Sequence, residues 1–208
     1  DYINTLMIVE PSTFSKSALH AIDNFVMRGG HVLAFVDPIS EVTDQETAIL
    51  NKSRQKNAGD YVELLKSWGI KFDESKTIAD RNLAKTVKIQ NNGREATIRY
   101  PLWIDFSSDN FDKHDVLMAN LERLTFATPG VLTKAENGTT NFNPLITTSD
   151  AAMLIDSAKM PEYQQNLGEL LNNYQPSGFY TVAARISGPI TSPYTGASVN
   201  DSSILVFS

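Results

Sequence analysis

The chain has 208 residues, of which 41% are hydrophobic and 20% are charged, a composition typical of globular proteins. Its formal net charge of −6 argues against nucleic acid as a partner, because phosphate binding requires a basic surface. The absence of cysteine excludes disulfides, thiolate metal sites and cysteine nucleophiles. No apolar run approaches the roughly 20 residues that a membrane-spanning helix needs. Because apolar strand-like runs lie close to both Asp1 and Ser208, we expect the chain to be a fragment of a longer protein.

The opening residues predict a βαβ unit. Residues 5–9 are apolar and partly β-branched, as in a buried strand. Over residues 16–28 apolar side chains recur at helical spacing, and Gly29-Gly30 ends this helix because a left-handed cap favours glycine. A second apolar run at residues 31–36 predicts the next strand. Since a helical crossover joins parallel strands, we expect an α/β fold with a parallel sheet.

The next segment combines a polar stretch with a second helix. Residues 39–57 are strongly polar, which predicts an exposed loop or lid that is mobile over residues 40–57. The helix that follows has an apolar face formed by Tyr61, Leu64, Leu65 and Trp68. Short strands are expected at residues 70–72 and 77–79.

From residue 86 the pattern becomes β-rich. Alternation on both sides of Asn91-Asn92-Gly93 predicts a hairpin that continues into an extended segment at residues 101–104. Helices are expected at residues 112–121 and 161–174. Further strands are expected at residues 124–127, 131–133, 145–148, 153–155, 179–186 and 204–207. We divide the chain into the first part of an α/β domain (1–85), a β-rich insertion or subdomain (86–143) and a return to the α/β sheet (144–208).

Acidic residues follow the predicted strands. Glu10 and Asp37 each come after an apolar run, and Asp80-Arg81 follows the strand expected at residues 77–79. Because the carboxyl ends of parallel strands usually form the ligand crevice, we take Glu10, Asp37, Asp80 and Arg81 as candidate ligand-binding residues. Such carboxylates suit a divalent cation or the hydroxyls of a sugar. The alternative is that Glu10-Pro11 and Asp37-Pro38 only form turns and caps.

Two further features have alternative interpretations. Ser12 lies where a helix N-terminus would point at an anion, so it joins the candidate ligand-binding residues, although simple capping is the commoner role of such a residue. Tyr100, Trp103 and Phe106 form either an aromatic platform for a sugar or lipid, or part of the core, which is the commoner role of such side chains.

No pattern of catalysis is found in the sequence. It has no glycine-rich nucleotide fingerprint and no Gly-x-Ser-x-Gly elbow. None of the histidines, His20, His31 and His114, has a second ligand at metal spacing. We therefore assign no catalytic residue, no metal and no cofactor, and we expect the chain not to be an enzyme.

The residues resemble a known family at several places in the same order. The run MIVEPSTFSKSALHAIDNFVMRGGHVLAFVDPISE (residues 7–41) is similar to the start of the auxiliary-component family of bacterial ABC transporters. That family includes the gliding-motility-associated substrate-binding-like protein. Further matches are residues 64–70, Asp80-Arg81, residues 101–104 and residues 144–146.

This resemblance implies a fold and a role. The fold it implies is a flavodoxin-like or amidotransferase-like, mostly parallel sheet with flanking helices. The role it implies is a non-catalytic, periplasmic (extracytoplasmic) domain whose parent protein is anchored in the inner membrane by helices outside this chain. The implied partners are an ABC permease and ATPase, together with an undefined small-molecule or glycan ligand. Two alternatives stay open: a hydrolase or amidotransferase-like enzyme that uses the strand-end crevice, and a pure protein–protein interaction module.

Overall fold

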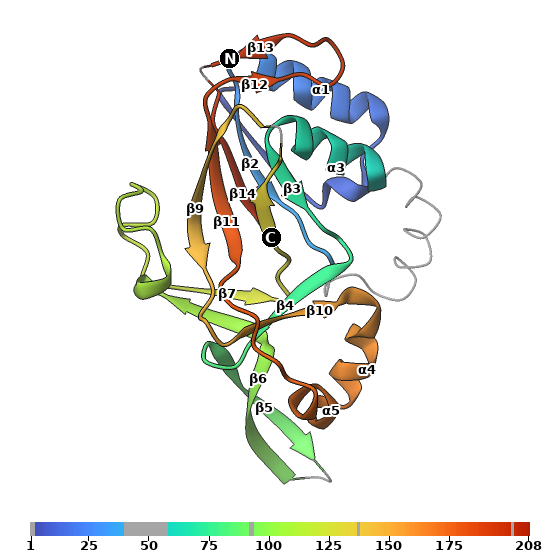
Figure 1. Cartoon of the computed structure of the whole chain (residues 1–208), viewed down its shortest axis with the longest axis vertical. Helices are drawn as coiled ribbons and strands as arrows, with labels where there is room; N and C mark the ends of the chain where they lie inside the picture. Colours follow the sequence, from blue (N-terminus) through green and yellow to red (C-terminus); the bar gives the residue numbers. More distant parts are fainter. Residues whose placement is uncertain (1–2, 40–57, 92–93, 137, 201) are drawn as a thin grey trace.

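The computed structural model describes residues 3–39, 58–91, 94–136, 138–200 and 202–208 (Figure 1). Its helices are the α-helices α1 (Lys16–Met27), α3 (Ala58–Ser67), α4 (Met160–Gln165) and α5 (Leu167–Asn172) and the 3-10 turns η1 (Pro11–Thr13), η3 (Ser108–Asn110) and η4 (Ser157–Lys159). Its strands are β1 (Thr5–Val9), β2 (His31–Phe35), β3 (Ile70–Phe72), β4 (Lys76–Asp80), β5 (Ala84–Asn91), β6 (Arg94–Ser107), β7 (Arg123–Ala127), β8 (Leu132–Lys134), β9 (Asn141–Thr147), β10 (Ala152–Asp156), β11 (Thr181–Ser187), β12 (Ile190–Thr191), β13 (Ser198–Val199) and β14 (Ile204–Phe207).

A seven-stranded sheet dominates the molecule. Its strand order is β1-β2-β14-β11-β8-β3, and β9 also pairs with β11. The pairs β1–β2 and β2–β14 are parallel, which confirms the predicted βαβ unit. The pairs that involve β11, and the pair β3–β8, are antiparallel. The expectation of a mostly parallel, flavodoxin-like sheet therefore does not hold: the protein is mixed α/β, because β11 runs antiparallel to each of its neighbours β14, β8 and β9.

The two faces of this sheet are covered differently. Helices α1 and α3 pack on one face, where Leu19 and Trp68 meet Ile8, Ala34 and Val206 in one buried cluster. Strands β5, β6 and β7 form a separate antiparallel sheet, and its residues reach the opposite face of the large sheet. Figure 1 shows this smaller sheet and β10 below the large one.

Aromatic rings mark the contact on that opposite face. The ring of Phe207 in β14 lies 5.4 Å from the ring of Phe35 and 6.5 Å from the ring of Phe126, measured between centroids. Phe106 is fully buried in the same cluster, which agrees with its interpretation as core. Tyr100 and Trp103 are half-buried and meet edge to face at 5.9 Å.

The segment expected to be a helix at residues 112–121 consists of turns instead. The Asp112 carboxylate accepts the backbone N–H of His114 at 3.0 Å, and the Asp115 carboxylate accepts that of Leu117 at 2.9 Å. Short acidic side chains that bond to the following backbone compete with a helix, so the apolar spacing was a misleading signal. Arg185 of β11 fixes the turns through bonds of 2.6 and 3.0 Å to Asp115, and this hydrogen-bonded partner lowers the pKa of the Asp115 carboxyl.

The helix expected at residues 161–174 is divided into α4 and α5. Asn166, with φ −131° and ψ 79°, lies outside the helical region and ends α4. Its side-chain oxygen accepts the backbone N–H of Glu169 at 3.3 Å and so caps α5. Both helices cover β4 and β10, which form a two-stranded antiparallel sheet.

Other predictions have mixed outcomes. The hairpin is confirmed, since β5 and β6 pair up to Asn91 opposite Arg94, and residues 92–93 lie outside the described part. The predicted mobile segment at residues 40–57 also lies outside the described residues. The division of the chain at residues 85 and 143 stays a prediction. Strands β5 to β7 form their own sheet, whereas β8, which the division also assigns to the insertion, pairs within the large sheet.

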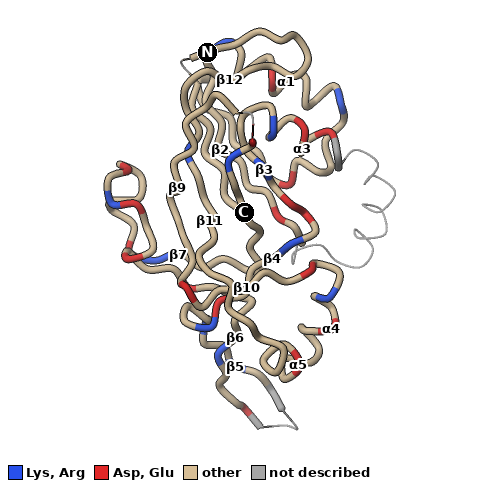
Figure 2. The backbone as a smooth tube through the Cα atoms, viewed as in Figure 1, with Lys and Arg blue, Asp and Glu red and all other residues tan. Residues whose placement is uncertain are grey.

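Charge and helix length complete the description. Figure 2 shows that the strands of the large sheet carry few charged residues, whereas helices and connecting turns carry many. Within the described residues, no helix is long and apolar enough to cross a membrane.

We predict that Gly69→Ala destabilises the fold strongly. Gly69 has φ +94°, and an added Cβ would lie 1.9 Å from Thr140 Oγ1, so the substitution combines backbone strain with a collision. We expect the free energy of unfolding to fall by at least about 2 kcal/mol in urea denaturation. The control is Gly29→Ala, which also follows a helix at φ +85° but has nothing within 4 Å of the new Cβ. It should lose only about 1 kcal/mol, and equal losses for both variants would contradict the collision.

Candidate functional site

Two of the predicted residues lie at the carboxyl ends of neighbouring parallel strands. Glu10 follows β1 and Asp37 lies just after β2, and the Glu10 backbone N–H donates to the carbonyl oxygen of Phe35 at 3.1 Å. Glu10 adopts left-handed angles, φ 49° and ψ 61°, which are unusual for a residue with a side chain. Ser12 lies in η1 directly after Glu10. The structure therefore brings Glu10, Ser12 and Asp37 to one rim of the large sheet.

A tyrosine and a further carboxylate belong to this rim. The Tyr61 hydroxyl of α3 donates to Glu74 Oε1 at 2.5 Å. Burial first, and then the negative charges of Glu74 and Asp37, raise the pKa of Tyr61 above its ordinary value, so the phenol keeps its proton. It acts as a hydrogen-bond donor at neutral pH. The sequence placed Tyr61 only on the apolar face of its helix, and no spacing signal linked it to Glu74.

Asp80 lies elsewhere and has a structural role. It belongs to β4, in the small sheet with β10, and its side chain is completely buried. Its carboxylate accepts the backbone N–H groups of Asn82 and Leu83 at 2.9 and 3.0 Å. It also accepts the backbone N–H and the hydroxyl of Ser149, each at 2.8 Å. The expected grouping of Asp80 with Glu10 and Asp37 at one sheet edge is not found, because β4 leaves the large sheet.

Arg81 is exposed and packs on an aromatic ring. Its guanidinium carbon lies 5.0 Å from the centroid of the Tyr174 ring, a cation–π distance. The Tyr174 hydroxyl donates to the carbonyl oxygens of Ala79 and Ala151 and accepts the backbone N–H of Arg81. Desolvation first, and the Asp80 charge second, raise the pKa of Tyr174. These contacts join β4, β10 and the segment that follows α5.

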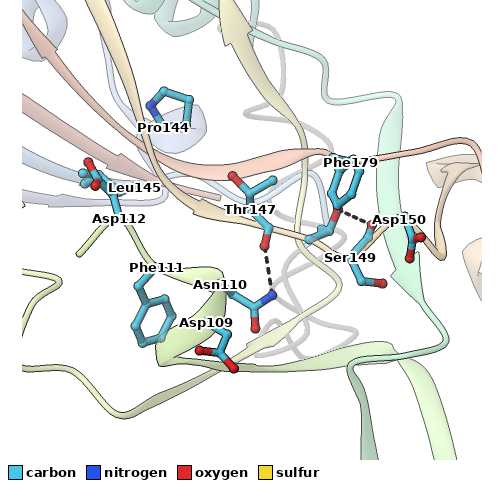
Figure 3. Close-up of a pocket in the computed structure, with 11 residues that line it drawn as sticks. Asp109, Asn110, Phe111, Asp112, Pro144, Leu145, Thr147, Ser149, Asp150 and Phe179 are labelled. Atoms are coloured by element: carbon cyan, nitrogen blue, oxygen red, sulfur yellow. Dashed lines mark hydrogen bonds between the residues drawn. The ribbon is translucent and has the colours of Figure 1, made fainter. Parts of the chain in front are cut away.

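An open pocket of about 570 Å³ is lined in part by Ser149, the residue that hydrogen-bonds to Asp80 (Figure 3). The sequence analysis did not single out this pocket. Figure 3 shows Asp109, Asn110 and Asp112 on one side and Ser149, Asp150 and Phe179 on the other. The Asn110 side-chain amide donates to the carbonyl oxygen of Thr147 at 3.3 Å and joins the two walls. Ser149, held by Asp80, belongs to the second wall, so Asp80 positions part of the pocket without lining it.

The chemistry of the pocket is that of hydrogen-bond acceptors beside an aromatic ring. Phe179 is 68% exposed, which is high for a phenylalanine. Asp109 has the ammonium of Lys113 at 3.3 Å, and the Asp112 carboxylate accepts the backbone N–H of His114. Carboxylates and amides beside an exposed ring suit noncovalent binding of hydroxyl-rich or cationic groups. The sequence analysis placed Asp112 in an expected helix and Phe179 in an expected strand, and no local signal pointed to a pocket between them.

The histidines have structural contacts. His31 Nδ1 accepts the backbone N–H of Ser203 at 3.1 Å, next to the start of β14. The His20 ring stacks on Tyr194, with 3.5 Å between centroids. Within the described residues, no group of three or more acidic or histidine side chains could hold a metal ion.

Comparison with known proteins decides the family. The family model described as "ABC-type uncharacterized transport system" matches residues 1–208. The chain belongs to this family. The name of the family model indicates an auxiliary component of an ABC-type transport system. No curated protein matches the chain.

The similarity to a solved structure is low. A chain described as "mmIFT52 N-terminal domain" matches 98% of this chain and 64% of its own length, with 9% identity and a TM-score of 0.47. The match thus covers 64% of the length of that solved chain. A likeness this distant does not indicate a function.

We predict that removal of the Asp80 carboxylate lowers the free energy of unfolding much more than removal of the Asp37 carboxylate. Asp80→Ala leaves the backbone N–H groups of Asn82, Leu83 and Ser149 without their acceptor in the fold, so it should cost more than about 2 kcal/mol of unfolding free energy. Asp37→Ala removes an exposed carboxylate and should change the unfolding free energy by less than about 0.5 kcal/mol while disturbing function. Chemical denaturation compares the two. A large stability loss in Asp37→Ala would contradict its assignment to a binding rim.

Proposed function

We propose that the chain is a non-catalytic, extracytoplasmic domain of a bacterial ABC transporter, with a substrate-binding-like or scaffolding role. The family match over the whole chain supports the link to a transport system. The observation that carries the non-catalytic role is the structural use of the buried Asp80 carboxylate. This carboxylate accepts four hydrogen bonds from neighbouring groups and holds the turn after β4 against Ser149. A carboxylate held in this way positions the chain segments that donate to it.

The location and the partners belong to the same proposal. The domain stands on the periplasmic side of the inner membrane, and its parent protein is anchored there and contacts a permease and an ATPase. Membership of the gliding-motility branch is proposed on the resemblance of residues 7–41 alone.

A substrate-binding-like role is favoured by the pocket of Figure 3. Sugars bind to proteins through pairs of hydrogen bonds to carboxylates and amides and through stacking on an aromatic ring. Asp109, Asn110, Asp150 and Phe179 supply these groups around one depression. The pocket is open to solvent, which suits a ligand that is bound and released without a chemical step.

We predict that the natural full-length protein copurifies with a permease and an ATPase from native membranes. A domain that serves a transporter must contact its other subunits, so both should be recovered in near-stoichiometric amounts after mild cross-linking and detergent extraction. Mass spectrometry of the purified complex checks this. Recovery of neither subunit would contradict the proposal.

The location can be tested with the same protein, because this domain contains no cysteine of its own. Val116→Cys introduces a thiol at a side chain that is 80% exposed. A membrane-impermeant maleimide added to spheroplasts should label it. Ala183→Cys, at a fully buried position, is the matched control and should stay unlabelled until the protein is denatured. Labelling of Val116→Cys only after lysis would place the domain in the cytoplasm.

We predict that Phe179→Ala weakens saccharide binding in the pocket. Loss of the stacking surface should reduce the affinity for the best member of a panel of neutral mono- and disaccharides by roughly fivefold. Saturation-transfer NMR on the purified chain measures this. Val116→Ala removes an even more exposed apolar side chain outside the pocket and should leave the affinity unchanged. If no saccharide binds, or if both variants behave alike, the pocket is not a saccharide site and the scaffolding role stands alone.

A further inference from the structure

Strand β1 lies at the edge of the large sheet, although its sequence is that of a central strand. Within the described residues it pairs with β2 alone. Its residues, Thr5-Leu6-Met7-Ile8-Val9, include no charged side chain and no proline. Natural edge strands usually carry such residues, because an unprotected edge invites pairing with another strand. Apolar side chains on both faces are typical of a strand with neighbours on both sides.

The exposure of β1 agrees with a missing neighbour. Leu6 and Ile8 point toward the helices and are partly or fully buried, whereas Met7 and Val9 are 64% and 52% exposed. On the latter face the register places Val9 beside Phe35, and Phe35 beside Phe207. The ring of Phe126 covers Phe207, whereas Met7 and Val9 of β1 are exposed. The covered part of this face of the sheet therefore ends before β1.

The free backbone groups of β1 can be assigned from the bonds on its other side. The Asn4 carbonyl accepts the His31 N–H at 2.9 Å, and the Glu10 N–H donates to the Phe35 carbonyl at 3.1 Å. In a parallel pair, alternate residues turn both backbone groups to the same neighbour. Even-numbered residues therefore face β2, and the N–H and C=O groups of Thr5, Met7 and Val9 face the open edge.

A groove lies along this edge on the helix side. It has a volume of about 760 Å³ and is lined by apolar side chains that include Leu6 of β1, Phe25 of α1 and Ile3, which precedes β1. Arg28 lines the same groove near the start of β1, while Glu10 follows the end of β1. The edge thus has an apolar centre with a positive charge at one end and a negative charge at the other.

We propose that a second copy of this chain occupies the edge, with two β1 strands antiparallel about a two-fold axis at Met7. Such an axis places Thr5 opposite Val9 of the other copy and Met7 opposite itself, so all outward backbone groups are paired. Because the strand is uncharged, like charges do not meet at its centre. The antiparallel arrangement brings Arg28 of one copy toward Glu10 of the other, so the charges complement each other. The two sheets become continuous, and the two α1 grooves face each other.

The absence of cysteine allows a direct test of this register. In a hydrogen-bonded antiparallel pair the facing Cα atoms are about 5.5 Å apart, within the range that a disulfide spans. Purified Met7→Cys should form a disulfide-linked dimer under mild oxidation, with twice the chain mass of 23.0 kDa. Val116→Cys, which is more exposed, is the matched control and should stay largely unlinked. A mixture of Thr5→Cys and Val9→Cys should give the mixed dimer in excess over either self-linked species.

Sedimentation of the unmodified chain gives an independent readout. It should show a concentration-dependent monomer–dimer equilibrium, and Met7→Lys should shift it to monomer at unchanged thermal stability, because a lysine would face its own copy across the axis. A chain that stays monomeric at every concentration overturns the proposal. Equal cross-linking of Met7→Cys and Val116→Cys also overturns it. So does a β1 edge that is protected only when the permease or ATPase is added, because the occupant is then another protein.

Discussion

Strand β14 holds the two halves of the molecule together. It lies between β2, to which it is parallel, and β11, to which it is antiparallel. Its alternate side chains enter different cores: Val206 packs with the α1 and α3 cluster, and Phe207 packs with the cluster that includes β6 and β7. A four-residue strand therefore fixes the N-terminal βαβ unit against the later strands, because its backbone bonds on both sides and its side chains on both faces are used at once.

The candidate sites follow from this arrangement. The rim with Glu10, Ser12 and Asp37 exists because β1 and β2 run in the same direction and end together. The pocket exists because β6 belongs to the separate small sheet and leads into η3, whose turn lies opposite the end of β9 in the large sheet. The Asp80 carboxylate connects the turn after β4 with the wall of the pocket, because it accepts hydrogen bonds from Asn82 in that turn and from Ser149 in the wall.

The sequence predicted the elements well where one physical signal dominated. The apolar strand at β2, the helix that ends at glycine and the hairpin between β5 and β6 depend on local periodicity and turn chemistry. It misjudged residues 112–121 because Asp112 and Asp115 bond to the backbone, an interaction that apolar spacing does not reveal. It also placed Asp80 with Glu10 and Asp37, because sequence order alone does not show that β4 pairs with β10. Phe179 and Asp109 gave no signal, since they meet only across the fold.

By itself the sequence determined the βαβ unit, the family to which the chain belongs and the apolar character of β1 on both of its faces. These are local properties, because they depend on the identity and spacing of neighbouring residues. Only the tertiary structure decided that the sheet is mixed, that Asp80 is a buried staple, and that β1 stands at an open edge. Each of these depends on strand partners distant in sequence, and such partners are selected by packing over the whole molecule.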